Sequence, residues 1–324
     1  MDQNPSLFAR AAELVHAIRV EVRKVFIGQD DVLDQVLAAF LAGGHVLVEG
    51  KPGLGKTHLI LALARTFGGQ FRRIQFTPDL MPSDVTGHTL YDMSAQTFRV
   101  RKGPVFTNLL LADEINRAPA KTQSALLEVM QEWQVTIDGE SHALPPPFMT
   151  LATQNPIEQE GTYPLPEAQL DRFMFLINVG YPTAAEELQI AKATTGSGVP
   201  SLEKIMTGAD ILLFQDIVRR VPVPDHVYEY VVKLVRKCRP KEVEAPDWVK
   251  KWVMWGPGPR AVQYLVLGAK ARAVLQGSYL VRLEDVQAVA EPVLAHRILV
   301  NFHAESEGVD SAEIIRRVMK ETEG

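Results

Sequence analysis

The sequence predicts an α/β domain with a parallel sheet, followed by a domain of helices. Short apolar runs alternate with helical segments as far as residue 182. Some of these runs, such as residues 109–112, are apolar on both faces, which is typical of central strands in a parallel sheet covered by helices. Beyond residue 182 helical periodicity prevails, interrupted by Gly and Pro turns. We therefore expect an αβα domain over residues 1–182 and an all-α domain over residues 183–324.

The elements of the first domain follow from local patterns. Helices are expected up to about Phe26, from Val32 to Gly43, from Lys56 to about Phe67, and from Ala120 to Trp133. The five expected strands cover residues 45–49, 71–76, 108–112, 148–153 and 173–179. Two segments, residues 77–106 and 135–147, break the alternation, so we expect inserted hairpins there, the second with its turn at residues 137–140.

The second domain begins with a helix start signal. Thr183 and Glu186 have the spacing of a capping box. Helical periodicity then covers residues 227–234, 261–275, 286–299 and 312–319. These segments predict a helical domain.

The bulk composition is that of an ordinary globular protein of 324 residues, with 46% hydrophobic and 23% charged residues. A net charge of -5 gives no general attraction to nucleic acid, which is therefore an unfavoured partner. The single cysteine, Cys238, excludes an intramolecular disulfide, and its apolar surroundings predict a buried thiol. No signal peptide opens the chain and no apolar run can span a bilayer, which predicts a cytoplasmic protein with no membrane span.

Residues 50–57, GKPGLGKT, fit the pattern G-x-x-x-x-G-K-[ST] between an expected strand and an expected helix. In such a loop, backbone N–H groups and the helix N-terminus bind phosphate. Lys56 is expected to reach the β- and γ-phosphates, and the Thr57 hydroxyl to coordinate Mg²⁺. A glycine-rich turn with a chance lysine is the alternative. The motif predicts a P-loop NTPase αβα sandwich that binds ATP and Mg²⁺. The expected nucleotide contacts here are Gly50, Pro52, Gly53, Leu54, Gly55, Lys56, Thr57 and His58.

A buried strand downstream ends in two carboxylates, Asp113 and Glu114. Asp113 is suited to hold Mg²⁺ through its water shell, and Glu114 to polarise an attacking water. The two carboxylates could instead cap the helix that follows. Small-molecule kinases rarely need the second carboxylate, so Glu114 favours hydrolysis.

The next strand also ends in a polar side chain, Asn155. Its amide could hold the same water or the γ-phosphate. A turn-forming asparagine is the alternative. The order of the three strand ends favours a role in catalysis.

Phosphate loop, Asp-Glu strand and polar-tipped strand, in this order, resemble the Walker A, Walker B and sensor 1 elements of AAA+ ATPases. Longer runs are similar to the MoxR family, in the helix-2-insert clade, and this resemblance covers nearly the whole chain. These runs are residues 111–118 (LADEINRA), 152–156 (ATQNP), 164–173 (PLPEAQLDRF), 259–261 (PRA) and 293–298 (VLAHRI).

The resemblance implies further site residues. Arg172 matches the segment where related proteins carry an arginine finger, which acts on the γ-phosphate of a neighbouring subunit. The alternative is an ion pair with Asp171 or another nearby acid, and Arg117 is the next candidate for the finger. Arg260 matches the sensor 2 arginine, although Gly258 replaces the serine usual before Pro-Arg. The segment matched to the adenine contact consists of Ile27, Gly28 and Gln29.

The resemblance also implies an assembly. A finger acting between subunits requires a homo-oligomeric ring, most simply a hexamer, with chaperone-like remodelling or maturation of a client protein complex. The family commonly works with a separate protein carrying a von Willebrand factor A domain. Two alternatives stay open, a DNA-remodelling AAA+ motor and a metal-insertion motor subunit like that of magnesium chelatase.

The first expected insertion is locally basic, through Arg99, Arg101 and Lys102. Its hairpin is either a solvated face or a surface that faces the central pore or an acidic partner.

Overall fold

The computed structural model describes residues 5–51, 53–155, 161–195 and 200–323. Its central feature is a five-stranded sheet in the order β2-β5-β8-β1-β9, with every neighbouring pair parallel. The strands are β1 (Val46–Gly50), β2 (Phe71–Gln75), β5 (Leu109–Asp113), β8 (Met149–Gln154) and β9 (Phe175–Val179). The predicted fold class is confirmed, and each strand begins and ends within two residues of its expected bounds.

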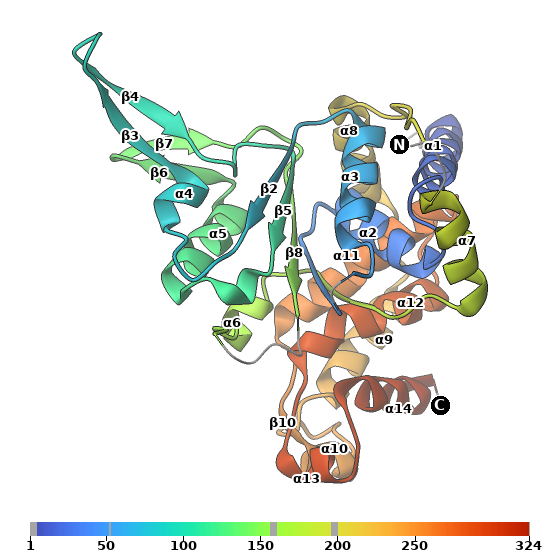
Figure 1. The fold of residues 1–324 in the computed structure, drawn as a ribbon. Coiled ribbons are helices and arrows are strands. Elements are labelled where there is room, and N and C mark those ends of the chain that lie inside the picture. The colour runs from blue at the N-terminus through green and yellow to red at the C-terminus, as the bar shows by residue number, and fades with distance from the viewer. Residues whose placement is uncertain (1–4, 52, 156–160, 196–199, 324) are drawn as a thin grey trace.

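The sheet is buried on both faces because its strands alternate side chains between two cores. Val46 and Val48 pack into one core, while Leu47 packs into the other. The first face is covered by α1 (Pro5–Arg23), α2 (Asp30–Ala42) and α3 (Lys56–Phe67), and the second by α4 (Pro82–Thr86) and α5 (Ala120–Glu132), as Figure 1 shows. This explains why the central strands are apolar throughout.

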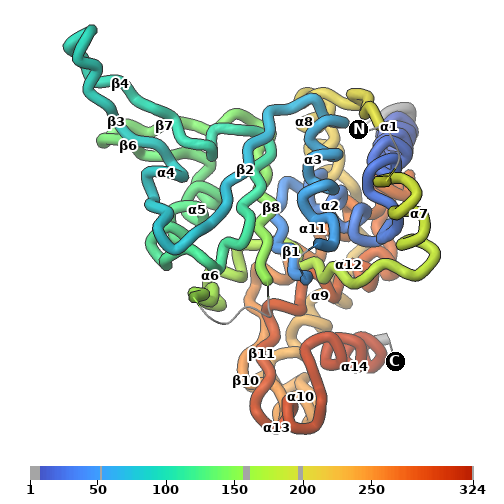
Figure 2. Tube along the Cα trace, viewed as in Figure 1, coloured from blue at the N-terminus to red at the C-terminus, as the bar shows by residue number. Residues whose placement is uncertain are grey.

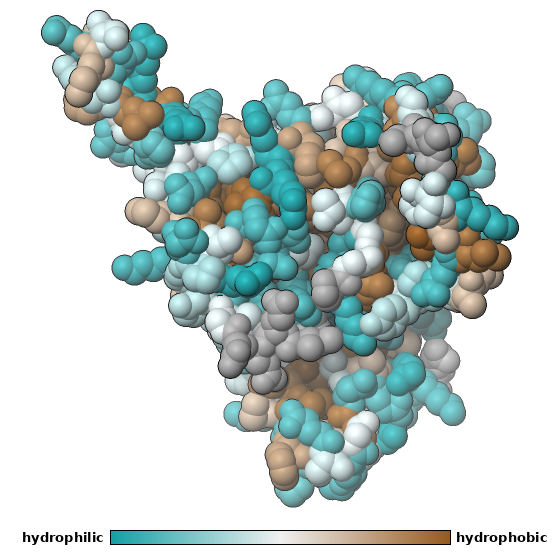
Figure 3. Space-filling model, in the orientation of Figure 1, coloured by the Kyte–Doolittle hydropathy of each residue, from teal (hydrophilic) through white to brown (hydrophobic). Residues whose placement is uncertain are grey.

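Both inserted hairpins are present. They are β3 (Gly87–Asp92) with β4 (Thr97–Lys102), and β6 (Gln134–Ile137) with β7 (Glu140–Ala143). The first projects from the body as an arm (Figure 3). Every residue of β4 is exposed, and the rings of Tyr91 and Phe98 stack edge to face on the arm, with centroids 5.1 Å apart.

The C-terminal part is helical, as predicted. Its helices are α7 (Ala184–Thr194), α8 (Gly208–Arg220), α9 (Asp225–Lys237), α10 (Asp247–Trp252), α11 (Pro259–Leu275), α12 (Leu283–Leu294), α13 (Phe302–Ser306) and α14 (Ser311–Glu323). The capping box at Thr183 and Glu186 is confirmed. Cys238 is buried, and burial raises the pKa of its thiol to about 12, so the thiol stays protonated.

One expected helix ends early. The periodicity over residues 286–299 predicts a single helix, but α12 ends at Leu294 and a 3₁₀ turn follows over Ala295–Arg297. Strand β11 (Leu299–Val300) then pairs antiparallel with β10 (Val253–Trp255). Strand pairing and the inward side chain of Arg297, which is 2% exposed, override the helical periodicity here.

The helical part packs closely on the α/β part. A single hydrophobic core joins residues of α1 and α2 to residues of α8, α9, α11 and α12. The far end of the helical part, with β10, β11, α10 and α13, projects away from the sheet (Figure 2). Within the described ranges, no helix combines the length and apolar character needed to cross a membrane.

Candidate functional site

The glycine-rich loop joins β1 to α3. Gly53 and Gly55 have φ values of 86° and 78°, a region that residues with a side chain rarely adopt, so the loop depends on glycine at these positions. Gly55 is also the N-cap of α3, whose first-turn N–H groups have no partner inside the helix. The local geometry is therefore that of an anion-binding helix start. Pro52, which the motif includes, lies outside the described residues.

Lys56 folds back over this loop. Its Nζ donates a hydrogen bond to the Gly50 carbonyl oxygen at 2.7 Å. Burial lowers the pKa of Lys56, while the carboxylates of Asp113, Glu114 and Glu49 oppose that shift. Three carboxylates from the ends of β1 and β5 thus act on one ammonium group at the carboxyl edge of the sheet.

Asp113 ends β5 and is held by both neighbouring strands. The Thr153 hydroxyl of β8 donates to Asp113 Oδ1 at 2.6 Å, and Arg73 of β2 donates to Oδ2 at 2.7 Å. The parallel register places these groups, since Ala112 pairs with Ala152 and Gln75 with Asp113. No role was predicted for Thr153 or Arg73 from the sequence. The sequence feature that could have indicated them is the polar side chain near the end of each strand adjacent to β5.

Glu114 has an unusual backbone. Its φ is 56°, a left-handed value that is uncommon outside glycine and that clusters at functional sites. Its N–H donates to Thr153 Oγ1 at 2.9 Å, and its Oε2 accepts from Gln75 Nε2 at 2.7 Å and from Arg117 Nη1 at 2.9 Å. The carboxylate is therefore fixed in direction. Arg117, the second candidate for the finger, contacts Glu114 of its own chain.

The residues present fit a Mg²⁺ ion. Thr57 lies in the first turn of α3, and Asp113 lies near Lys56, so that hydroxyl and carboxylate oxygens flank the phosphate loop. Mg²⁺ prefers oxygen ligands and keeps several of its waters. Two such side chains are sufficient for an ion that also binds phosphate.

The remaining strand-end residues belong to the same edge of the sheet. Asn155 follows β8 directly and is buried. The preceding residue, Gln154, donates to Glu49 at the end of β1. His58, on the first turn of α3, is exposed. The predicted residues of the phosphate loop, β5 and β8 thus lie at the carboxyl edge of one sheet.

Of the segment Ile27, Gly28 and Gln29, the last residue lines a cavity of about 440 Å³ whose other walls come from the start of α2, the end of β9, α12 and α14. Gln29 Nε2 donates to the Gly180 carbonyl at 3.1 Å, while its buried Oε1 has no hydrogen-bond partner within the described ranges. Tyr181, in the cavity wall, has Lys51 of the phosphate loop 4.7 Å above its ring. The cavity therefore adjoins the phosphate loop.

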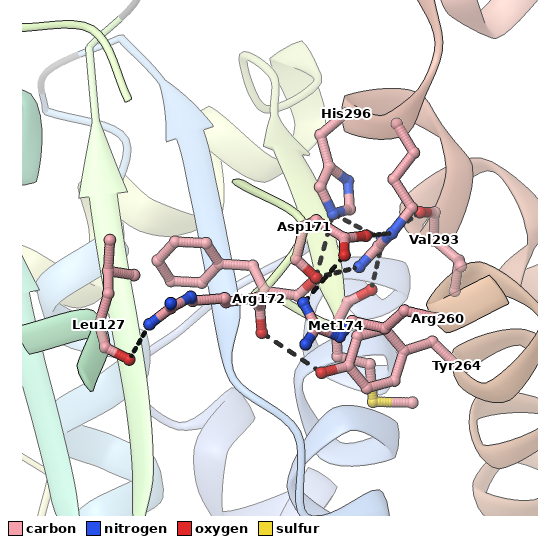
Figure 4. A network of polar contacts seen from close by, with 10 residues as sticks. Leu127, Asp171, Arg172, Met174, Arg260, Tyr264, Val293 and His296 are labelled. Atoms are coloured by element: carbon pink, nitrogen blue, oxygen red, sulfur yellow. Dashed lines mark hydrogen bonds and ion pairs between the residues drawn. The ribbon is translucent and has the colours of Figure 1, made fainter. Parts of the chain in front are cut away.

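Arg172 and Arg260 lie at the junction between the sheet and the helical part (Figure 4). Arg172 follows α6 (Glu167–Leu170) and donates to the Leu127 carbonyl at 2.8 Å, and it makes no ion pair among the described residues. Asp171 instead binds Arg260 at 2.9 Å and Arg297 at 2.8 Å. The suggested pair of Asp171 with Arg172 is therefore not formed. No role was predicted for Arg297, since its partner is more than a hundred residues away.

Comparison with known proteins agrees with this geometry. Residues 45–175 match the family described as ATPase family associated with various cellular activities (AAA), and residues 249–318 match the AAA lid domain. The chain is 44% identical to Chaperone MoxR1 of Mycobacterium tuberculosis over 300 residues, which cover 93% of this chain and 79% of that protein. This chain belongs to the MoxR family of AAA+ ATPases.

Other relatives support the assignment of this MoxR-family protein. It is 31% identical to Protein MoxR of Methylorubrum extorquens, with 86% of each chain covered. The crystal structure of a protein from Cytophaga hutchinsonii, assigned as an ATPase, matches it with a TM-score of 0.91 and 41% identity, covering 97% of this chain and 96% of that one. The family resemblance of the sequence is confirmed, and with it the hydrolysis of ATP as the activity.

Proposed function

We propose that this MoxR-family ATPase hydrolyses Mg²⁺-bound ATP at the edge of the sheet where Lys56, Asp113, Glu114 and Thr153 meet. The observation that carries this proposal is the convergence of these side chains from α3, β5 and β8 on the phosphate loop. Lys56 gives up its hydrogen bond to the Gly50 carbonyl oxygen and binds the β- and γ-phosphates instead. Thr57 and Asp113 hold Mg²⁺, which supplies charge compensation for the phosphates.

Glu114 is the residue that we assign to the attacking water. Its carboxylate is oriented by Gln75 and Arg117, and its backbone N–H is fixed by Thr153. A carboxylate fixed in this way can accept a hydrogen bond from water and direct it at the γ-phosphate. Asn155, on the adjacent strand end, supports the same water or the terminal phosphate.

The nucleoside belongs in the cavity next to the phosphate loop. Ile27, Gly28 and Gln29 contact the adenine, largely through backbone and apolar groups. The Oε1 of Gln29, which has no hydrogen-bond partner among the described residues, adds one acceptor that can receive a hydrogen bond from an exocyclic amino group.

We further propose that the site is completed in a ring of identical subunits, a hexamer in the helix-2-insert clade of AAA+ proteins. The clade assignment rests on the β3–β4 hairpin inserted after β2 and α4. Arg172 serves the γ-phosphate of a neighbouring subunit, and Arg260, on the first turn of α11 and beside Arg172 at the amino edge of the sheet, serves the same neighbour. The half-buried Arg172 side chain lines a surface pocket together with Ser124, Leu127 and Glu128 of α5, where a neighbour can reach it.

The work of this ring is chaperone-like remodelling or maturation of a client protein complex. This part of the proposal is supported by the 44% identity with a protein named Chaperone MoxR1. A separate protein with a von Willebrand factor A domain is the partner that we infer from the family.

Glu114→Gln tests the assignment of the active site. The variant should bind ATP with wild-type affinity and turn it over at least about a hundredfold more slowly, because the amide cannot act as a base. Glu140→Gln, which alters an exposed carboxylate on β7, is the matched control and should change neither quantity. Wild-type turnover by Glu114→Gln would remove Glu114 from the reaction.

A further inference from the structure

Asp171 shares its carboxylate between two arginines of the helical part. Its Oδ1 accepts from Arg297 Nε at 2.8 Å, and its Oδ2 accepts from Arg260 Nη1 at 2.9 Å (Figure 4). Both arginines come from segments at least 89 residues away along the chain. One side chain thus joins the start of α11 and the turn after α12 to the segment that precedes β9.

The pair with Arg297 is a fixed one. The Arg297 side chain is 2% exposed, and its Nη2 donates to the carbonyls of Asp171 and Phe173 at 2.8 and 2.7 Å. Its guanidinium also lies 5.1 Å from the ring centroid of Tyr264. Burial lowers the pKa of Arg297 and the Asp171 carboxylate opposes this shift, so that the carboxylate keeps the buried arginine charged. Loss of this pair would leave a buried charge uncompensated.

The pair with Arg260 is of a different kind. The Arg260 side chain is 39% exposed, and exposed ion pairs contribute little to stability, so this contact can break at small cost. Arg260 stands on the first turn of α11, and one turn later the Tyr264 hydroxyl donates to the Arg172 carbonyl at 3.4 Å. The same face of α11 therefore holds both Asp171 and the backbone of Arg172.

We propose that Asp171 is a positioning residue that competes with the γ-phosphate for Arg260. Without nucleotide or with ADP, Arg260 stays on Asp171. With ATP, Arg260 exchanges Asp171 Oδ2 for the γ-phosphate, while Arg297 continues to neutralise the carboxylate. Asp171 thereby sets how strongly the lid arginine distinguishes ATP from ADP. This inference rests on the proposed role of Arg260 toward the nucleotide.

A double-mutant cycle tests the competition. Dissociation constants for ATP and for ADP are measured on the full chain in the Glu114→Gln background, with Asp171→Asn, Arg260→Ala and both together. Asp171→Asn should tighten ATP binding about two- to fivefold, the range of an exposed ion pair, and leave ADP binding unchanged. In the Arg260→Ala background the same substitution should have no effect on either nucleotide. An effect of equal size on ATP and ADP, or one that persists without Arg260, would overturn the proposal.

Two further results separate the possible failures. If Arg260→Ala alone leaves the ratio of ATP to ADP affinity unchanged, the proposed role of Arg260 is wrong. If that ratio changes but Asp171→Asn is silent, only the competition is wrong. Should Asp171→Asn unfold because Arg297 loses its partner, the cycle is repeated with Arg297→Met in every variant, so that no buried charge is left without a partner. The same pattern is expected there, and its absence would contradict the proposal.

Discussion

Two polar clusters of this protein differ in how they are built. The phosphate-side cluster, Lys56 with Asp113, Glu114 and Thr153, comes from the ends of neighbouring elements of one sheet. The junction cluster, Asp171 with Arg260 and Arg297, joins segments far apart in the sequence and includes an arginine that is 2% exposed. We infer that the phosphate-side cluster serves ligand binding, whereas the junction cluster stabilises the fold. We expect the first cluster to be dispensable for folding and the second to be required for it.

Lys56→Ala should weaken ATP binding strongly without destabilising the fold. Loss of the ammonium leaves phosphate charge unpaired at a cost of about 2–5 kcal/mol, so the affinity for ATP should fall by at least about thirtyfold. The free energy of unfolding should not decrease, because burial already disfavours the charged lysine. Calorimetric titration and chemical denaturation measure the two quantities, with the exposed Lys121→Ala as control. Unfolding of Lys56→Ala would mean that the phosphate-side cluster is also required for folding, which contradicts the expected difference between the two clusters.

Asp171→Ala should show the reverse pattern. Removing one partner of a buried ion pair leaves Arg297 uncompensated, so the free energy of unfolding should fall by about 3 kcal/mol, the low end of the range for such pairs. Arg260→Ala removes the exposed half of the cluster and should cost no more than about 1 kcal/mol. Urea denaturation of both variants checks this order. Equal losses would mean that burial of Arg297 does not determine the stability of the junction.

Burial of His45 beside the sheet should also make the free energy of unfolding decrease at acidic pH. Thr150 N–H donates to His45 Nδ1 at 3.0 Å, and Nε2 lies 3.0 Å from the Met130 carbonyl, which fixes a neutral ring with its proton on Nε2. Burial lowers the pKa of His45 from 6.5 to about 4. The folded state therefore binds this proton less readily than the unfolded state. The resulting stability is present above the unfolded pKa and is lost as the pH falls toward the folded pKa.

From about pH 7 to about pH 5 the loss attributable to His45 should be about 2 kcal/mol. Denaturation curves across this interval measure it. His45→Gln should flatten this part of the pH dependence, while the exposed His16→Gln should not. An unchanged slope in His45→Gln would show that His45 is not the group responsible.

Asn155→Ala should have a smaller effect than Lys56→Ala at the same edge of the sheet. Its amide is proposed to contact only the water and the terminal phosphate, so turnover should drop by about tenfold while the affinity for ADP is kept. Steady-state kinetics together with ADP titration make the comparison. If the affinities for ATP and ADP fall together, Asn155 is a structural turn residue.

The sequence predicted the phosphate-side cluster well because local patterns specify it. The helix from Lys56 to Phe67 has the bounds that the motif predicts, and Asp113 and Glu114 stand at the end of the strand as expected. The contacts with Thr153 and Arg73 depend on the register between neighbouring strands. A single sequence does not specify this register, although the polar residues near the strand ends could have suggested it.

The junction cluster could not be predicted in the same way. Asp171 meets Arg297 across 126 residues of sequence, and no periodicity encodes that contact. For the same reason the end of α12 was missed, since a buried ion pair and a two-stranded ladder decide it. The family resemblance identified Arg172 and Arg260 as candidate site residues. The residues that contact these two arginines are known only from the structure.

We propose that each active site is shared between two subunits. Mixing Arg172→Ala with Lys56→Ala tests it, because one variant keeps the phosphate loop and the other keeps the arginine. An arginine finger contributes roughly 10³–10⁵ in rate in related phosphoryl transfers, and Lys56→Ala weakens ATP binding, so each variant alone should be nearly inactive. In mixed rings, an interface that pairs the intact loop with the intact Arg172 should recover ATP hydrolysis in proportion to its frequency. Demonstrated subunit exchange without any recovery, or full activity of Arg172→Ala alone in a confirmed ring, would contradict the claim.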